Sequence, residues 1–246
     1  MSSQAIGSGR PRALAIAAVL ALGAAAAVAA ALLWPYAAGG MLSVQVREAA
    51  AADADGRSVD WAALREINPD VAAWVTVPGT AIDYPVVQAR PEDPEHWLSH
   101  AFDGSPNRVG SVYLDAESQG DGVSALTPYV YGHSLLDGSM FSDFARFADP
   151  SYASEHDRIE VSAPEGDMEL RVIGVAVVPG DSGRRTGVSG QAALASFYAD
   201  ALSRCGILLD PPSGVDRLWT FVTCAYSTGN YRVLVLACSN DAGRSR

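Results

Sequence analysis

The sequence predicts a mainly β domain of about eight short strands with only a few helices. The first observation is a series of short, β-rich apolar runs bounded by glycine, proline and polar turn residues. The second is the length of 246 residues, which favours one domain of about 180–190 residues plus appendages. This pattern suits a small closed barrel, although strand spacing alone does not distinguish a barrel from a sandwich.

Composition excludes several classes of function. The formal net charge is −11, which argues against nucleic acid as a partner. There is no C-x-x-C motif and no histidine cluster, so no metal or other cofactor is expected. Three cysteines cannot all pair within one chain, so at least one is free. Cys205 and Cys238 are expected to be ordinary buried thiols, with a bridge between them as the alternative.

An uncharged N-terminal stretch predicts a membrane anchor. Residues 1–12 are polar, and Ala13–Trp34 contains 22 residues without a charge. A helix of that length spans about 33 Å, enough for a bilayer core. Arg10 and Arg12 precede it and acidic residues follow, which places the N-terminus in the cytoplasm and the body outside the cell. A cleaved secretory signal is the alternative.

The remaining chain divides into a linker (35–57), a domain (58–240) and a tail (241–246). Ser58 or Asp60 is a suitable N-cap for a helix over Trp61–Ile67. Asn68-Pro69 interrupts that helix, and Asp70–Trp74 is expected to begin a further short helical turn.

The alternation of apolar runs and turns then predicts the strands. They are Val75–Val77, Ile82–Val87, Ser111–Leu114, Leu126–Tyr131, Arg158–Ser162, Met168–Val178, Leu218–Val222 and Tyr231–Ala237. Helices are expected over Phe141–Phe147 and Gln191–Cys205, and at most a short one around Trp97–Phe102. His96 and His100, near that last segment, are interpreted as ordinary surface histidines.

The last two strands carry a pair of reactive groups. Cys224 stands at the end of one strand and Arg232 near the start of the next, with a polar turn between them. Adjacent antiparallel strands lie about 4.8 Å apart, so both side chains face one site if their parity agrees. A thiolate is a strong nucleophile, and a guanidinium suits an anion or an oxyanion.

A cysteine nucleophile needs a group that handles protons, and His133 is the best candidate. It follows the apolar run Tyr129–Tyr131 and Gly132, at the end of a predicted strand. Strand ends and the loops after them are common places for functional residues.

These motifs together resemble class B sortases. The resemblance is carried by Tyr131-Gly-His133 with Asp137-Gly-Ser-Met-Phe141, by Thr223-Cys224-x-Tyr226 with Arg232, and by the upstream stretches Ile67–Trp74 and Pro78–Gln88. Each motif alone is weak, but their order is specific and covers about Trp61 to Ala237. The resemblance implies a sortase β-barrel with N-terminal helices, and a helix before the cysteine strand that forms one wall of the substrate groove.

The resemblance also implies a reaction and partners. Cys224 would attack the carbonyl of a threonine in the C-terminal sorting signal of a secreted protein, forming a thioester. His133 would act as general acid and base, and Arg232 would stabilise the oxyanion or hold the substrate carbonyl. Thr223 and Tyr198 are candidate substrate contacts, with core packing as the alternative for Tyr198. The acyl acceptor would be the amine of a peptidoglycan precursor or of a pilin lysine.

Two other functions are compatible with the sequence. One is a catalytically inactive surface module that binds sorting-signal peptides. The other is a different cell-wall cysteine peptidase, against which the order of the residues argues, since His133 precedes Cys224. The chain departs from the family pattern at Ser134, where class B members often carry Asn, and in its short turn between Cys224 and Arg232.

Overall fold

The computed structural model describes residues 19–30, 45–51, 58–118, 120–180, 188–225 and 230–239, with the side chains of 224 and 225 outside that description. Residues 19–30 form a helix within the predicted anchor, and the remainder of Ala13–Trp34 lies outside the described residues. Within the described ranges, none of the helices combines the length and the apolar character that a membrane span needs. The predicted tail also lies outside the described residues.

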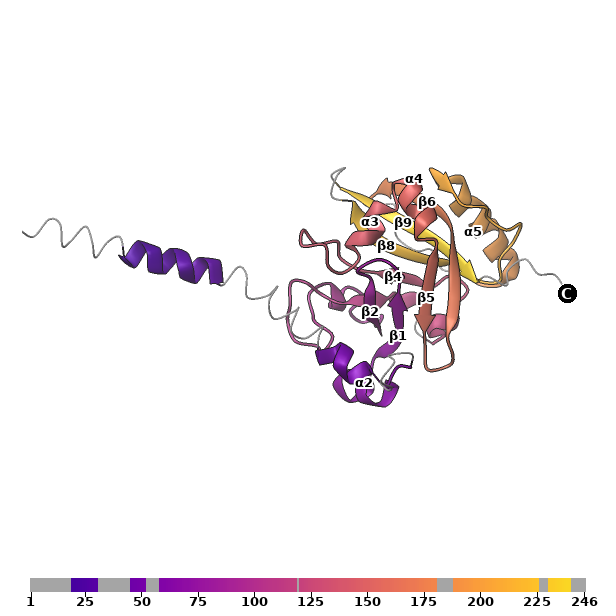
Figure 1. The fold of residues 1–246 in the computed structure, drawn as a ribbon. Helices are drawn as coiled ribbons and strands as arrows, with labels where there is room; N and C mark the ends of the chain where they lie inside the picture. The colour runs from indigo at the N-terminus through magenta and orange to yellow at the C-terminus, as the bar shows by residue number, and fades with distance from the viewer. Residues whose placement is uncertain are drawn as a thin grey trace, which may run out of the picture.

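Nine strands of the described chain form one sheet, and eight of them close into a barrel (Figure 1). Their order is β5-β1-β2-β3-β4-β8-β9-β6, and a β5–β6 pairing joins the two ends. The pairs β2–β3 and β4–β8 are parallel, whereas the others are antiparallel. The predicted closed barrel of about eight strands is therefore confirmed.

The bounds of the strands agree with the sequence pattern in most places. The strands are β1 (Val71–Thr76), β2 (Asp83–Gln88), β3 (Val112–Leu114), β4 (Tyr129–Tyr131), β5 (Arg158–Ser162), β6 (Met168–Pro179), β7 (Ile207–Leu208), β8 (Trp219–Ala225) and β9 (Tyr231–Ser239). β7 was not predicted, because two residues are too few to produce a periodic pattern. β7 pairs with β6 through Val175 and Ile207, further along β6 than the segment that pairs with β5.

One helical prediction is confirmed and its neighbour is wrong. Helix α2 (Trp61–Ile67) begins after Asp60, whose carboxylate accepts a hydrogen bond from the backbone N–H of Ala63. The expected helical turn over Asp70–Trp74 is instead part of β1, from Val71 onward. β1 pairs with β2 on one edge and β5 on the other, and these two ladders override the local preference.

The interior of the barrel follows the alternation of side chains along each strand. Trp219 and Phe221 of β8 pack in the main core with Val233, Val235 and Ala237 of β9. Leu236 instead belongs to a separate cluster on the outer face, together with Leu194 and Tyr198 of α5 (Gln191–Ser203). Residues of even number on β8 and β9 therefore face outward.

A short helix closes the barrel beside β8. Helix α3 (Ser142–Arg146) supplies Phe144 to the main core, where its ring stacks on Phe221 at a centroid distance of 5.2 Å. Helix α4 (Pro150–Glu155) follows and was not predicted, although its signal is present: Asp149 caps it, and Pro150 occupies the first turn.

Part of the predicted linker packs onto the domain. Residues 45–50 form a helix whose Val46 and Ala50 are buried in a cluster with Leu64 of α2 and Trp74 of β1. The backbone N–H of Asp60 donates to the carbonyl of Ala50 at 2.8 Å. These residues therefore contribute to the packed domain.

Candidate active site

The cysteine and the arginine predicted to act together lie on neighbouring strands. β8 and β9 are antiparallel, and their register sets Cys224 directly opposite Arg232. The side chain of Cys224 is outside the described residues, so its place follows from the backbone. Directly opposed residues in an antiparallel pair project to the same face of the sheet.

The histidine lies on the other side of the cysteine strand. β4 runs parallel to β8, with Tyr131 beside Val222, and the backbone N–H of Gly132 donates to the carbonyl of Val222 at 3.1 Å. His133 follows two residues after Tyr131, and Cys224 follows two residues after Val222. Positions 133, 224 and 232 thus form a row that starts just past the end of β4 and crosses β8 and β9.

This row runs along the outer face of the barrel. Val130 of β4 and Phe221 of β8 point into the main core, and Val233 of β9 does the same. Arg232 is next to Val233 along β9, so its side chain points to the outer face. A peptide can approach such a row from solvent without unfolding the core.

Hydrogen bonds fix the place of His133. Its carbonyl accepts a hydrogen bond from the backbone N–H of Phe141 at 2.7 Å, which closes the loop that follows the strand. Its ring nitrogen Nε2 lies 2.9 Å from the carbonyl oxygen of Leu98. A carbonyl has no proton to donate, so Nε2 carries the hydrogen in this contact and Nδ1 is unprotonated in the neutral ring.

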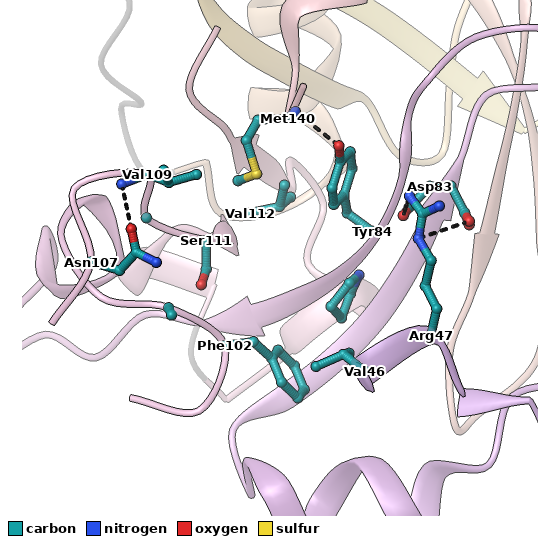
Figure 2. Close-up of a pocket in the computed structure, with 13 residues that line it drawn as sticks. Val46, Arg47, Asp83, Tyr84, Phe102, Asn107, Val109, Ser111, Val112 and Met140 are labelled. Carbon is teal, nitrogen blue, oxygen red and sulfur yellow. Dashed lines mark hydrogen bonds and ion pairs between the residues drawn. The ribbon is translucent and has the colours of Figure 1, made fainter. Parts of the chain in front are cut away.

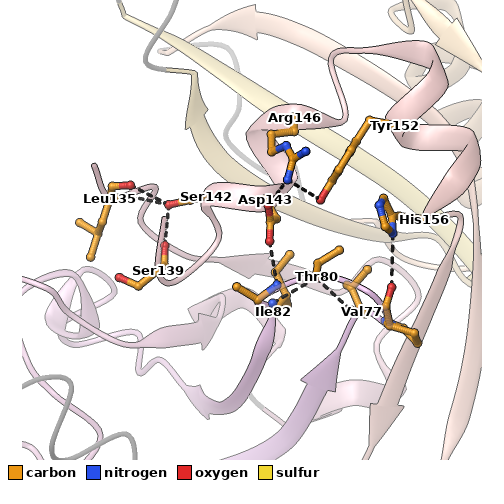
Figure 3. A network of polar contacts seen from close by, with 12 residues as sticks. Val77, Thr80, Ile82, Leu135, Ser139, Ser142, Asp143, Arg146, Tyr152 and His156 are labelled. Atoms are coloured by element: carbon orange, nitrogen blue, oxygen red, sulfur yellow. Dashed lines mark hydrogen bonds and ion pairs between the residues drawn. The ribbon is translucent and has the colours of Figure 1, made fainter. Parts of the chain in front are cut away.

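The loop after His133 is held by the hydroxyl of Ser142 (Figure 3). Its Oγ accepts from the backbone N–H of Leu135 at 2.7 Å and lies 2.5 Å from the carbonyl of Ser139. Asp137 is exposed, and its carboxylate accepts from the N–H and the hydroxyl of Ser139, which forms a local turn. Asp137 therefore has a structural role, which is to hold this turn.

Figure 3 also shows how helix α3 joins the turn between β1 and β2. The carboxylate of Asp143 accepts from the backbone N–H of Ala81 at 2.7 Å and pairs with Arg146 at 3.0 Å. Arg146 in turn lies over the ring of Tyr152, 3.9 Å from its centroid. This network fixes α3, and with it the loop that ends at Phe141, against the barrel.

Arg232 is half-buried and anchored at one nitrogen. Its Nε donates to the carbonyl of Gly180 at 2.8 Å, just beyond the end of β6. Within the described part of the chain, its terminal nitrogens make no hydrogen bond. A guanidinium held in this way keeps donors for a carbonyl or an oxyanion.

Tyr131 lies close enough to Arg232 for the two to interact electrostatically. Burial raises the pKa of the Tyr131 phenol, the carboxylate of Asp115 raises it further, and the positive charge of Arg232 opposes that rise. The phenol therefore stays neutral, and Tyr131 contributes a neutral, half-buried ring next to the row.

The two predicted substrate contacts are both buried. Thr223 is 1% exposed, and the alternation along β8 directs its side chain away from the face of Cys224. Tyr198 is 5% exposed, packs in the cluster under α5, and donates its hydroxyl to the carbonyl of Pro212 at 2.7 Å. Both placements disfavour direct contact with a peptide on the outer face, and for Tyr198 they support the packing alternative.

The remaining thiols and imidazoles have structural surroundings. Cys205 and Cys238 are free, as expected, and burial raises the pKa of both, that of Cys205 to about 11. His96 stacks on His100 with ring centroids 3.8 Å apart. The described residues contain no group of side chains arranged to hold a metal ion.

A small cavity of about 50 Å³ lies next to β2 (Figure 2). It is bounded by Val46, by Tyr84 of β2 and by the loop from Ala101 to Ser111. The hydroxyl of Tyr84 accepts from the backbone N–H of Met140 at 2.9 Å. His133 and Arg232 do not line this cavity.

Sequence reasoning missed two partners of the row. The carbonyls of Leu98 and Gly180 hold His133 and Arg232, but every residue has a carbonyl. Residue identity therefore gives no signal for them, and only the course of the backbone brings them to the site.

Comparison with known proteins finds relatives in sequence and in fold. No family model matches the chain. Sortase B of Listeria monocytogenes is 28% identical over 134 residues, which cover 54% of this chain and 53% of that relative. Sortase B of Staphylococcus aureus is 28% identical over 178 residues, covering 71% and 72%. A solved S. aureus sortase B–substrate complex has a TM-score of 0.65 at 24% identity, covering 82% of this chain and 90% of that one.

The barrel has the sortase fold, and the sequence is similar to those of two sortases. Both of these relatives are sortase B proteins, so the chain resembles that family. The match spans about half the length of the Listeria relative and most of the Staphylococcus relative.

Proposed function

We propose that this chain cleaves a C-terminal sorting signal after threonine and transfers the acyl group to an amine. Cys224 is the nucleophile, His133 the general acid and base, and Arg232 the oxyanion donor. The observation that supports the proposal is the pairing of Cys224 with Arg232 across β8 and β9, with His133 two residues after β4, the strand on the other side of β8.

The chemistry follows from the three groups. The Cys224 thiolate attacks the threonine carbonyl, and Arg232 donates hydrogen bonds to the resulting oxyanion. The C–N bond breaks when the protonated His133 gives its proton to the departing amine, which leaves a thioester and a neutral imidazole. An incoming amine then attacks the thioester, His133 takes its proton, and the thiolate leaves with an amide as product.

The solved Staphylococcus aureus sortase B–substrate complex supports a peptide as the ligand. We extend that ligand to this chain as a secreted protein with an Asn-Pro-x-Thr type of sorting signal, which is usual for class B. For the acceptor we retain both amines, a peptidoglycan precursor and a pilin lysine. The catalytic unit of the proposal is the domain of residues 58–240, together with the packed helix at 45–50.

We also propose that the protein is a single-pass membrane protein with its catalytic domain outside the cell. The uncharged stretch Ala13–Trp34 and the preceding arginines support this orientation. Protease treatment of intact cells should digest the domain. Protection of the domain would contradict this location.

The activity is tested with a quenched fluorescent peptide that contains the sorting signal. Each of the two acceptor amines is added in a separate reaction. Wild-type protein should cleave it and form the amide with one acceptor, while Cys224→Ala and His133→Ala should lose cleavage by at least about 10³-fold. Cys205→Ala is the matched control and should retain it. Binding of the peptide without turnover by the wild type would instead indicate an inactive peptide-binding module. Cleavage by Cys224→Ala would refute the assignment.

A further inference from the structure

The contact between His133 and Leu98 determines which ring nitrogen is available for chemistry. Nε2 donates to the Leu98 carbonyl at 2.9 Å, so the neutral ring has Nδ1 as its only proton acceptor. In the proposed function, His133 must exchange protons with the departing and the incoming amine. The position of one backbone carbonyl therefore selects the nitrogen that does so, and this inference rests on the proposed function.

The Leu98 carbonyl belongs to a short segment that is fastened on two sides. Leu98 is the last residue of the 3-10 helix η1 (His96–Leu98). On one side, the indole N–H of Trp97 donates to the carbonyl of Gln88 at the end of β2, at 3.1 Å. On the other side, the backbone N–H of Ser111 donates to the carbonyl of Trp97 at 2.8 Å. The hydroxyl of Ser111 donates to the carbonyl of His100 at 2.9 Å.

Gly110 lies directly against the same carbonyls. A Cβ at this position would be 2.7 Å from the carbonyl oxygen of Trp97 and 2.8 Å from that of Leu98. Backbone oxygens that are themselves hydrogen-bonded cannot move away as the end of a flexible side chain can. Gly110 also has φ +66°, a conformation that residues with a side chain rarely adopt.

Nearby contacts hold Gly110 in this position. Its N–H donates to the carbonyl of Asn107 at 3.0 Å. The side-chain oxygen of Asn107 accepts from the N–H of Val109 at 2.8 Å, as Figure 2 shows. The turn over Asn107–Gly110 is therefore fixed by its own hydrogen bonds, so a methyl group on Gly110 would displace η1 and its carbonyls.

We infer that Gly110 is a positioning residue: by leaving room for the Leu98 carbonyl, it holds His133 in the tautomer with the proton on Nε2. In this inference, residues 107–111 act on the chemistry through η1.

The chain offers a matched control in the same loop. Gly104 also has a positive φ, +79°, but a Cβ there would meet nothing within 4 Å. Gly104→Ala and Gly110→Ala thus share the strained backbone conformation and differ in whether the new methyl group presses on the Trp97 and Leu98 carbonyls.

The experiment measures the ring nitrogens of His133 by ¹⁵N NMR at a pH at which the imidazole is neutral. Wild type and Gly104→Ala should show a protonated Nε2 and a bare Nδ1. Gly110→Ala should show a mixture of tautomers and at least about a tenfold lower kcat for the sorting peptide, with a smaller change in KM. If Gly110→Ala does not fold, Ser111→Ala, which loses only the bond to the His100 carbonyl, should show the same spectral change at smaller amplitude.

The outcomes separate this inference from the proposed function. Nitrogen resonances unchanged in Gly110→Ala, or in Ser111→Ala where the first variant is unfolded, would overturn it even if Cys224 proves essential for cleavage. Conversely, a wild-type protein that does not cleave the peptide refutes the proposed function. Even in that case, the difference in tautomer between the wild-type and Gly110→Ala spectra decides whether Gly110 positions the ring.

Discussion

Gly132 and Phe141 are packed so closely that a Cβ on Gly132 would lie 2.6 Å from the Phe141 ring. The ring is fully buried in the main core, and the backbone N–H of Phe141 donates to the carbonyl of His133. The absence of a side chain at residue 132 therefore allows the loop after β4 to fold back beneath the histidine. This contact explains why a glycine immediately precedes His133.

Gly132→Ala should destabilise the domain by about 1–3 kcal/mol through overpacking, because the ring has no free space into which to move. Peptide cleavage should fall as well, since His133 shifts with its carbonyl. Thermal unfolding and the quenched-peptide assay measure the two effects. Gly214→Ala is the control, as a Cβ there meets nothing within 4 Å. Equal unfolding temperatures for the two variants would contradict the packing argument.

Arg232→Lys should retain the fold and lose about 10²–10³ in kcat. The lysine ammonium keeps the positive charge. It lacks the rigid guanidinium fork, which can donate to the Gly180 carbonyl and to an oxyanion at the same time. Steady-state kinetics check this, with circular dichroism to monitor the fold. Arg158→Lys makes the same chemical change at a solvent-exposed ion pair and should leave kcat unaltered. Full activity of Arg232→Lys would show that charge alone suffices.

Tyr198→Phe separates packing from substrate binding. The variant removes the hydrogen bond to the Pro212 carbonyl and should cost about 1 kcal/mol of unfolding free energy, with KM for the sorting peptide unchanged. Chemical denaturation and peptide kinetics measure the two quantities. A raised KM at unchanged stability would restore Tyr198 as a substrate contact.

The same tyrosine contributes to alkaline unfolding. Burial raises the pKa of Tyr198 from 10.0 to about 12, so the folded state keeps the proton that the unfolded state releases. The contribution of Tyr198 to stability is therefore complete below pH 10 and is lost as the pH rises from about 10 to about 12. Denaturation curves across this range should fall less steeply for Tyr198→Phe than for the wild type, and parallel curves would contradict the assignment.

Thiol labelling should distinguish Cys224 from the other two cysteines. Burial raises the pKa of Cys205 to about 11 and also raises that of Cys238, so neither holds much thiolate at pH 8. Iodoacetamide should add one group to the folded wild-type protein and none to Cys224→Ala, as read by intact mass. An adduct on Cys205 or Cys238 of the folded protein would count against this prediction.

Local patterns predicted much of the barrel. β5 has the predicted bounds, and β6, β8 and β9 begin at or within one residue of their predicted starts. The miss at β1 has a non-local cause. β1 was expected to begin as helix because its residues Val71–Trp74 follow a helix and a proline, yet two strands from elsewhere in the chain pair with it. Such pairing depends on distant residues and cannot be read from a local window.

By itself, the sequence determined which reactive side chains are present and where along the chain they stand: an imidazole after one strand, a thiol at the end of another and a guanidinium at the start of the next. The tertiary structure decided what each of them meets. The parallel pairing of β4 with β8 sets Tyr131 beside Val222, each two residues before His133 and Cys224, although 90 residues lie between these two. It also brings the carbonyls of Leu98 and Gly180 to His133 and Arg232. Backbone carbonyls are common to all residues, so only the folded path of the chain distinguishes these two from the others.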